Sequence, residues 1–155
     1  MVAHAKVVEE MPVESAQVFD LLHDYDRRLE WDTLLRAARL EGGGSAGVGR
    51  IAVCTARRAL GGFSFRTRYV SFDRPRLAAL TLVAHAPFFH RWAASIRHED
   101  LPGGGSTAAY TLTFTCRPAW AAGVIEPVAQ AVFTWETKRR LRALARVLGG
   151  RPQPR

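Results

Sequence analysis

The chain has 155 residues, enough for one domain with its own hydrophobic core, and its 48% hydrophobic and 10% aromatic content excludes an intrinsically disordered protein. The net charge of +8 comes from cations in the C-terminal segment rather than from a broad basic face with interleaved aromatic residues, so we expect no nucleic-acid partner. No apolar run reaches the roughly 18 residues of a membrane span, the first residues lack the apolar stretch of a signal peptide, and two cysteines are too few for a disulfide scaffold. We therefore expect a cytoplasmic protein without a transmembrane segment.

The N-terminal segment predicts a strand at 3–11, a short helix at 14–23 and a second short helix at 26–34. Residues 9–32 hold eight acidic residues and two arginines. On short amphipathic helices these carboxylates form a solvated face, or they attract the basic C-terminal helix within the molecule.

Segments of alternating polarity then follow one another between glycine clusters, which is the pattern of antiparallel strands with one buried face. The clearest example places Phe63, Phe65 and Tyr69 on one face and Arg66 and Arg68 on the other. The predicted strands after the N-terminal segment lie at 36–41, 49–57, 63–72, 77–84, 88–98 and 106–117. Arg91 and Arg97 are predicted to face outward as well.

The glycine cluster at 42–47 satisfies two catalytic patterns, G-x-G-x-x-G and G-x-S-x-G. Both patterns require a helix directly after the loop, for phosphate binding or for a nucleophile elbow. A predicted strand follows instead. We therefore interpret the cluster as a turn between two strands.

After Pro118 the sequence predicts a long helix that starts, or bends, near Pro127 and ends at Gly149-Gly150, since proline fits a first helical turn and glycine a C-terminus. Its buried stripe is predicted to contain Phe133, Leu141, Leu144 and Leu148, with Ala129 and Thr137 between them. A second stripe of Val128, Val132 and Trp135 continues into Arg139, Arg142 and Arg146. We expect this second stripe to pack on the N-terminal helices, with a membrane, quinone or protein surface as the alternative.

Together these elements predict one α+β domain over residues 1–150: a curved seven-stranded antiparallel sheet around a long C-terminal helix, with two short N-terminal helices. Residues 151–155 are predicted to be a disordered tail. The five histidines lack metal-ligand spacing, so we expect no metal and no cofactor.

The segment from Met11-Pro-Val to Asp24-Tyr25, followed by Glu30-Trp31-Asp32, resembles the opening of the START-like (SRPBCC) superfamily, which includes polyketide cyclase/dehydrase and lipid-transport proteins. Gly47-Val-Gly49 before a strand, Phe72-Asp-Arg-Pro75 at a hairpin, Gly105-Ser-Thr107 before a late strand, and the Leu141-x-x-Leu144 pair extend the likeness over residues 3–148. The resemblance implies a helix-grip fold, in which the sheet grips the C-terminal helix around a hydrophobic cavity. It implies no particular reaction, because members include carriers, receptors and cyclases.

Three functions follow as hypotheses. The first is binding of a hydrophobic, aromatic, polyketide-like or lipid ligand in the cavity; the second is a polyketide aromatase/cyclase that uses the same cavity. The third is a binding module for a membrane, quinone or protein surface, with a homodimer left open. A core filled by its own side chains is the structural alternative to any cavity.

The predicted ligand-binding residues face inward on the strands and on the long helix: Phe63, Phe65, Thr67, Tyr69, His90, Trp92, Tyr110, Leu112, Phe114, Ala129 and Phe133. Of these, His90, Tyr69 and Tyr110 are the candidates for proton transfer. The inward-facing strand positions include no cation, so we expect a neutral ligand with one or two polar groups.

Overall fold

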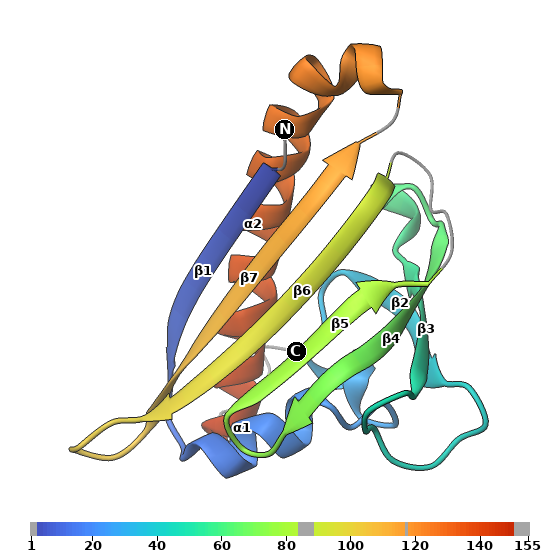
Figure 1. The fold of residues 1–155 in the computed structure, drawn as a ribbon. Helices are drawn as coiled ribbons and strands as arrows, with labels where there is room; N and C mark the ends of the chain where they lie inside the picture. Colours follow the sequence, from blue (N-terminus) through green and yellow to red (C-terminus); the bar gives the residue numbers. More distant parts are fainter. Residues whose placement is uncertain (1–2, 84–88, 117, 151–155) are drawn as a thin grey trace.

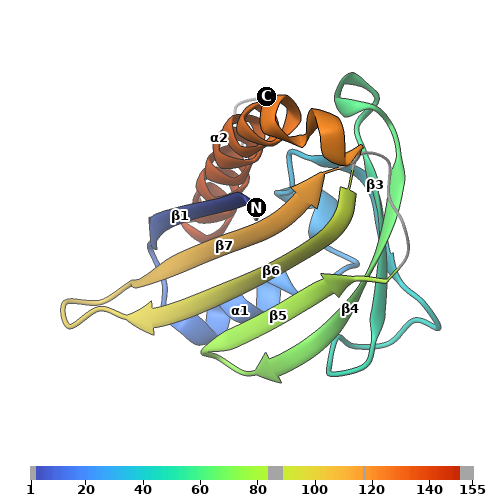
Figure 2. The same cartoon turned by 45° about the horizontal axis from the view of Figure 1, so that its top comes forward.

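A single curled antiparallel sheet packs against one long helix (Figures 1 and 2). The structure is a computed structural model and describes residues 3–83, 89–116 and 118–150. Its strands are β1 (Ala3–Met11), β2 (Leu35–Leu40), β3 (Ile51–Ala56), β4 (Ser64–Asp73), β5 (Leu77–Leu82), β6 (Phe89–Asp100) and β7 (Ser106–Cys116). Its helices are α1 (Ser15–Leu22), α2 (Ala122–Leu148) and the short 3-10 turns η1 (Arg28–Glu30), η2 (Arg58–Leu60) and η3 (Ala119–Ala121).

The strand order is β1-β7-β6-β5-β4-β3-β2, so the first strand pairs with the last and the chain then returns strand by strand to β2. Every neighbouring pair is antiparallel. The helix α2 runs along the concave side of this sheet, behind β1, β7 and β6 in Figure 1.

The predicted strands agree with the observed strands, with ends that differ by at most two residues wherever the structure describes them. The predicted ends at 84, 88 and 117 lie outside the described residues. The glycine cluster at 42–47 connects β2 to β3, as predicted, and a strand rather than a helix follows it. Alternation of polarity between glycine clusters therefore located the strands of the sheet.

The helix predictions were less accurate. The second short helix predicted at 26–34 is only the single turn η1. The side chain of Asp32 accepts a hydrogen bond from the backbone N–H of Leu34 at 3.1 Å, which turns the chain toward β2 before a longer helix forms.

The long helix begins at Ala122, so Pro127 lies inside the helix rather than in its first turn. Proline removes one backbone hydrogen bond at this point. The turn before it is anchored from outside, because Oε1 of Glu126 accepts a hydrogen bond from the N–H of Cys116 at 3.2 Å and Ile125 packs on the neighbouring apolar cluster. These contacts hold the first turns of α2 against the end of β7 and keep the helix continuous.

The core lies between the sheet and the predicted stripe of α2. Thr137, Leu141 and Leu144 are no more than 1% exposed, while Phe133 and Leu148 are partly buried against the same core. The two cysteines, Cys54 and Cys116, are buried free thiols, as their small number suggested.

The second stripe of α2 does not pack on the N-terminal helices, so that prediction was wrong. Val128 is 62% exposed, Val132 46% and Trp135 58%. Arg139 stacks over the ring of Trp135 at 4.6 Å, and Arg142 pairs with Glu9 of β1 rather than with an acid of the N-terminal helices. The curled sheet turns one face of α2 inward and leaves this face to solvent.

The two aromatic residues of α2 should therefore differ in their effect on stability. Phe133→Ala should lower the free energy of unfolding by about 3 kcal/mol, because Phe133 packs against Phe89 and Phe114 with ring centroids 5.5 and 5.3 Å away. Trp135→Ala should cost less than about 1 kcal/mol, since that ring is largely exposed. Chemical denaturation of the two variants checks the order, and a larger loss for Trp135→Ala would contradict it.

Candidate ligand cavity

A cavity of about 550 Å³ lies between the concave face of the sheet and α2. Its walls come from β3 to β7, from η1 and from α2. Val124, Val128 and Val132 both line the cavity and are exposed, so the cavity opens along this face of α2. A volume of this size is within the range of small-molecule sites, about 300–1,000 Å³.

Nine of the eleven predicted ligand-binding residues line the cavity. They are Phe63, Phe65, Thr67, Tyr69, Trp92, Tyr110, Leu112, Ala129 and Phe133. The arginines predicted to face outward, Arg66, Arg68, Arg91 and Arg97, are exposed or half-exposed and do not line it. Whether these nine residues contact a ligand stays a prediction.

His90 does not line the cavity, contrary to the prediction from alternation. The register of β6 against β7 shifts between Phe89 and Arg91, so His90 is the extra residue of a β-bulge. The bulge turns Phe89 inward and leaves His90 exposed. His90 is therefore removed from the candidates for proton transfer.

Phe114 is 1% exposed and does not line the cavity. It packs edge-on against Phe89 at 5.9 Å and against Phe133 at 5.3 Å between ring centroids. Phe114 thus packs behind two residues that line the cavity. The two-residue period of a strand predicts that a side chain faces inward, but not whether it lines the cavity or lies beneath a lining residue.

At the inner end of the cavity, three side chains form a buried hydrogen-bonded chain. The hydroxyl of Tyr69 lies 2.8 Å from the hydroxyl of Tyr25 and 2.8 Å from Nδ1 of His23. All three residues line the cavity. Of these, only Tyr69 was predicted, because His23 and Tyr25 lie in the turn after α1, where no strand period applies.

Burial keeps all three side chains of this hydrogen-bonded group, His23, Tyr25 and Tyr69, uncharged. It raises the pKa of Tyr25 to about 12 and raises the pKa of Tyr69 well above its usual range, so both phenols stay protonated near neutral pH. Burial lowers the pKa of the His23 imidazole well below its ordinary value, and the charge of Arg28 lowers it further. These three side chains therefore present a neutral imidazole and two protonated hydroxyls to the cavity.

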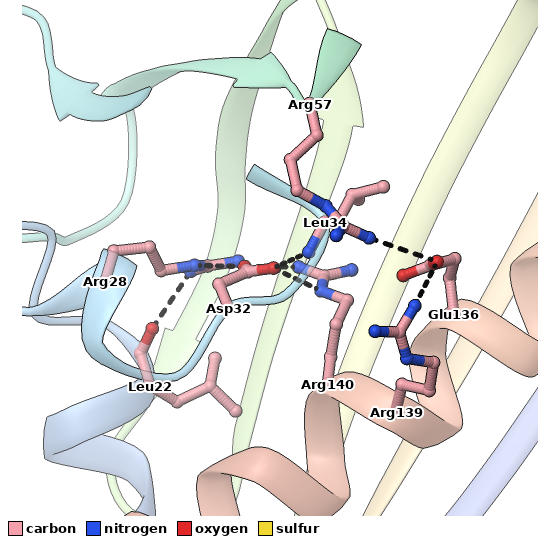
Figure 3. A network of polar contacts seen from close by, with 8 residues as sticks. All are labelled: Leu22, Arg28, Asp32, Leu34, Arg57, Glu136, Arg139 and Arg140. Atoms are coloured by element: carbon pink, nitrogen blue, oxygen red, sulfur yellow. Dashed lines mark hydrogen bonds and ion pairs between the residues drawn. The ribbon is translucent and has the colours of Figure 1, made fainter. Parts of the chain in front are cut away.

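A buried ion cluster lies beside this chain, with Asp32 bridging two arginines (Figure 3). Nε of Arg28 donates to Oδ2 of Asp32 at 2.7 Å, and Nε and one terminal nitrogen of Arg140 donate to the two carboxylate oxygens at 2.8 and 2.9 Å. Arg28 also donates to the carbonyl of Leu22 at 2.9 Å. Arg28 and Arg140 line the cavity, so cations reach it from η1 and α2, although its described strand positions supply none, as expected.

The cations come from η1 and α2 rather than from strands, which is why strand alternation missed them. Burial by itself would raise the pKa of Asp32, but the guanidinium groups of Arg140 and Arg28 outweigh it and hold that pKa below its ordinary value. Asp32 is thus not part of a solvated face, and the alternative that N-terminal acids attract the basic helix is confirmed for this residue.

Glu136 completes the polar lining, one helical turn before Arg140. Its Oε1 accepts a hydrogen bond from Arg139 at 3.1 Å and lies 3.5 Å from a terminal nitrogen of Arg57 (Figure 3). Glu136 and Arg140 share the face of α2 that carries Phe133 and Thr137. A carboxylate and a guanidinium on a buried stripe were the available sequence signal for this part of the site.

Among the described residues, no group of three or more histidine, cysteine or acidic side chains is placed to hold a metal ion. None of the described helices is both long enough and apolar enough to cross a membrane.

The sequence profile of the polyketide cyclase / dehydrase and lipid transport family matches residues 3–149. The chain belongs to this family, as the START-like resemblance of its opening segment predicted. A search of curated proteins finds no matching sequence.

Solved structures share the fold over nearly the whole chain. The aromatase/cyclase Zhui from Streptomyces sp. R1128 is 16% identical, with a TM-score of 0.81 over 96% of this chain and 94% of its own. XoxI from Bacillus cereus is 18% identical, with a TM-score of 0.74 over 94% and 95% of the two chains, and Ara h 8.0201 is 16% identical, with a TM-score of 0.72 over 97% and 99%. At these identities the likeness establishes the helix-grip fold, as predicted.

Asp32 should be among the most sensitive positions of the chain. Asp32→Asn should lower the free energy of unfolding by about 3–5 kcal/mol, because two buried guanidinium groups lose their counter-charge. The matched control is Asp20→Asn, whose pair with Arg74 is 56% and 53% exposed at its two side chains and should be worth less than about 1 kcal/mol. Urea denaturation measures both; similar small losses would show that the buried cluster does not stabilise the fold.

Asp32→Asn should also change how the free energy of unfolding responds to acid. The pKa of Asp32 is lower in the folded chain than in the unfolded chain, so its stabilisation is present above the unfolded value of about 3.9 and is lost as the pH falls through the folded value. The unfolding free energy of the unmodified protein should therefore fall more steeply in acid than that of Asp32→Asn. Parallel pH profiles from urea denaturation would argue against this role.

Proposed function

We propose that the protein binds an apolar small molecule, aromatic, polyketide-like or lipid, in the cavity between the sheet and α2. The observation that carries the proposal is an open cavity of about 550 Å³ whose walls are mainly aromatic and aliphatic. Burying apolar ligand surface there is favourable by roughly 25 cal/mol per Å². Membership of a family described by polyketide cyclases and lipid transport supports the same chemical class.

The opening of the cavity supports access from solvent. Val124, Val128 and Val132 recur every four residues, so they form one row along α2, and each is at least 46% exposed. A ligand that enters along this row meets apolar side chains before it reaches the polar inner end. Contact of this row with a membrane or protein surface, and pairing of two copies, stay predictions.

Filling the cavity should abolish binding. Ala129→Phe adds a ring at a half-buried lining position, whereas Ala131→Phe adds the same ring at an exposed position of the same helix that does not line the cavity. Native mass spectrometry with a size series of polycyclic aromatics should detect one bound molecule in the unmodified protein and in Ala131→Phe, and much less in Ala129→Phe. Equal binding by the two variants, or none by the unmodified protein, would count against the proposal.

Cyclisation of a polyketone is the second candidate, and the hydrogen-bonded chain of His23, Tyr69 and Tyr25 favours it. Cyclisation needs an oriented chain, a proton acceptor and donors that polarise a ketone. The phenols stay protonated and so can donate, while the imidazole of His23 is neutral and is the proton acceptor of this candidate, although burial and Arg28 disfavour its charged form.

A variant separates this candidate from binding alone. Tyr69→Phe removes the central hydroxyl of the chain and keeps the ring, so a cyclase should lose about 10²–10⁴-fold in rate while a carrier keeps its affinity for apolar aromatics. Chromatographic analysis of the products of a reactive polyketone measures the rate. No acceleration by the unmodified protein would exclude the cyclase and leave the binding proposal standing.

A further inference from the structure

We propose that Glu136 is the acceptor that selects, among apolar ligands, those that carry a neutral hydroxyl group. This inference rests on the proposed function and specifies its ligand class. It follows from one carboxylate oxygen, Oε2 of Glu136, that is buried and has no hydrogen-bond partner among the described residues.

The two oxygens of Glu136 have different surroundings. Oε1 faces Arg139 and Arg57, at 3.1 and 3.5 Å, whereas Oε2 has no hydrogen-bond partner among the described residues. The side chain is 3% exposed, yet Glu136 lines the cavity. Oε2 is thus closed to bulk water, and Glu136 borders the cavity from which a ligand would approach it.

A buried acceptor without a donor costs free energy, and buried polar groups are almost always satisfied. In this position a ligand can supply the missing donor. A hydroxyl, phenol or enol fits, whereas an ether or a ketone brings only a second acceptor.

The surrounding charges exclude an ammonium group as that donor. The ion pairs around the inner end contain four guanidinium groups, from Arg28, Arg57, Arg139 and Arg140, against the two carboxylates of Asp32 and Glu136. A ligand cation placed against Glu136 would face this excess of positive charge. A neutral donor has no such penalty.

The position of Glu136 along α2 sets the direction of the ligand. Val124, Val128, Val132, Glu136 and Arg140 follow at intervals of four residues and all line the cavity. The row begins at the exposed opening and ends at the buried ion cluster. The apolar body therefore lies along the valines, with its hydroxyl at the inner end against Glu136.

Three pyrene probes of similar shape test the inference: hydroxypyrene, methoxypyrene and pyrenemethylamine. Titration followed by pyrene fluorescence in neutral buffer should show hydroxypyrene binding about ten- to a hundredfold more tightly than methoxypyrene, which is the effect of one hydrogen bond to a charged group. Pyrenemethylamine, which is cationic at this pH, should bind no better than methoxypyrene. Equal affinity for hydroxypyrene and methoxypyrene would overturn the inference while leaving the proposed function intact, and failure of all three probes to bind would overturn the proposed function itself.

Glu136→Gln assigns the preference to this residue. Because the arginines require the amide oxygen, the amide nitrogen turns toward the cavity and converts the acceptor into a donor. The preference for hydroxypyrene over methoxypyrene should vanish or invert. Glu126→Gln is the matched control, since Glu126 is also buried on α2 but does not line the cavity, and it should leave the preference unchanged.

A measurement on the unmodified protein keeps the inference testable if Glu136→Gln does not fold. The carboxyl carbon of Glu136, observed by ¹³C NMR in glutamate-labelled protein, should shift on adding hydroxypyrene and not on adding methoxypyrene. A preference for hydroxypyrene without that shift would assign the hydroxyl to another acceptor, such as His23, and would refute the role of Glu136.

Discussion

The bridge from Asp32 to Arg28 and Arg140 is the constraint on which the rest of the molecule depends. It joins residues 108 positions apart and fixes α2 relative to the segment that follows α1. A buried ion pair stabilises a fold only when its geometry is good and its polar atoms are hydrogen-bonded. Here one carboxylate serves two guanidinium groups, so loss of Asp32 would leave two buried cations at once. The bridge lies at the cavity wall, since both of its arginines line the cavity.

Most of the sheet could be predicted from the sequence because strand alternation reports directly on which face is buried. The alternation fails at a bulge, where one extra residue exchanges the two faces, and His90 lost its predicted place for this reason. The long helix could be predicted in its C-terminal part from the Leu141 and Leu144 stripe. Its start at Ala122 could not, because contacts from Glu126 and Ile125 hold the residues before Pro127 in helical conformation.

The candidate site also has a part that could be predicted from the sequence and a part that could not. Its apolar walls on the strands could be predicted, because strand alternation places their aromatic side chains on the concave face of the sheet. Its polar end could not, because His23, Tyr25 and Arg28 come from turns without a period, and their partners on β4 and α2 are distant in the chain. Glu136 and Arg140 were visible as polar residues on a buried helix stripe. Such a break in an apolar stripe is a signal that the space beside it is polar or occupied.

The chemistry of the inner end restricts what the cavity can hold. Its phenols stay protonated, its imidazole stays neutral, and the charge of Asp32 is already compensated by two arginines. Among the cavity-lining residues that the structure describes, what remains for a ligand is a set of hydrogen-bond donors, Nε2 of His23 and one carboxylate oxygen without a partner, Oε2 of Glu136. A small ion would have to leave water for a cavity whose walls are mainly apolar, at a large desolvation cost. A neutral molecule with a hydroxyl at one end and an apolar body at the other loses little water and satisfies both parts of the cavity. The bridge that holds α2 in place also bears on the proposed selectivity, because it places Arg140 on the cavity wall, one helical turn after Glu136.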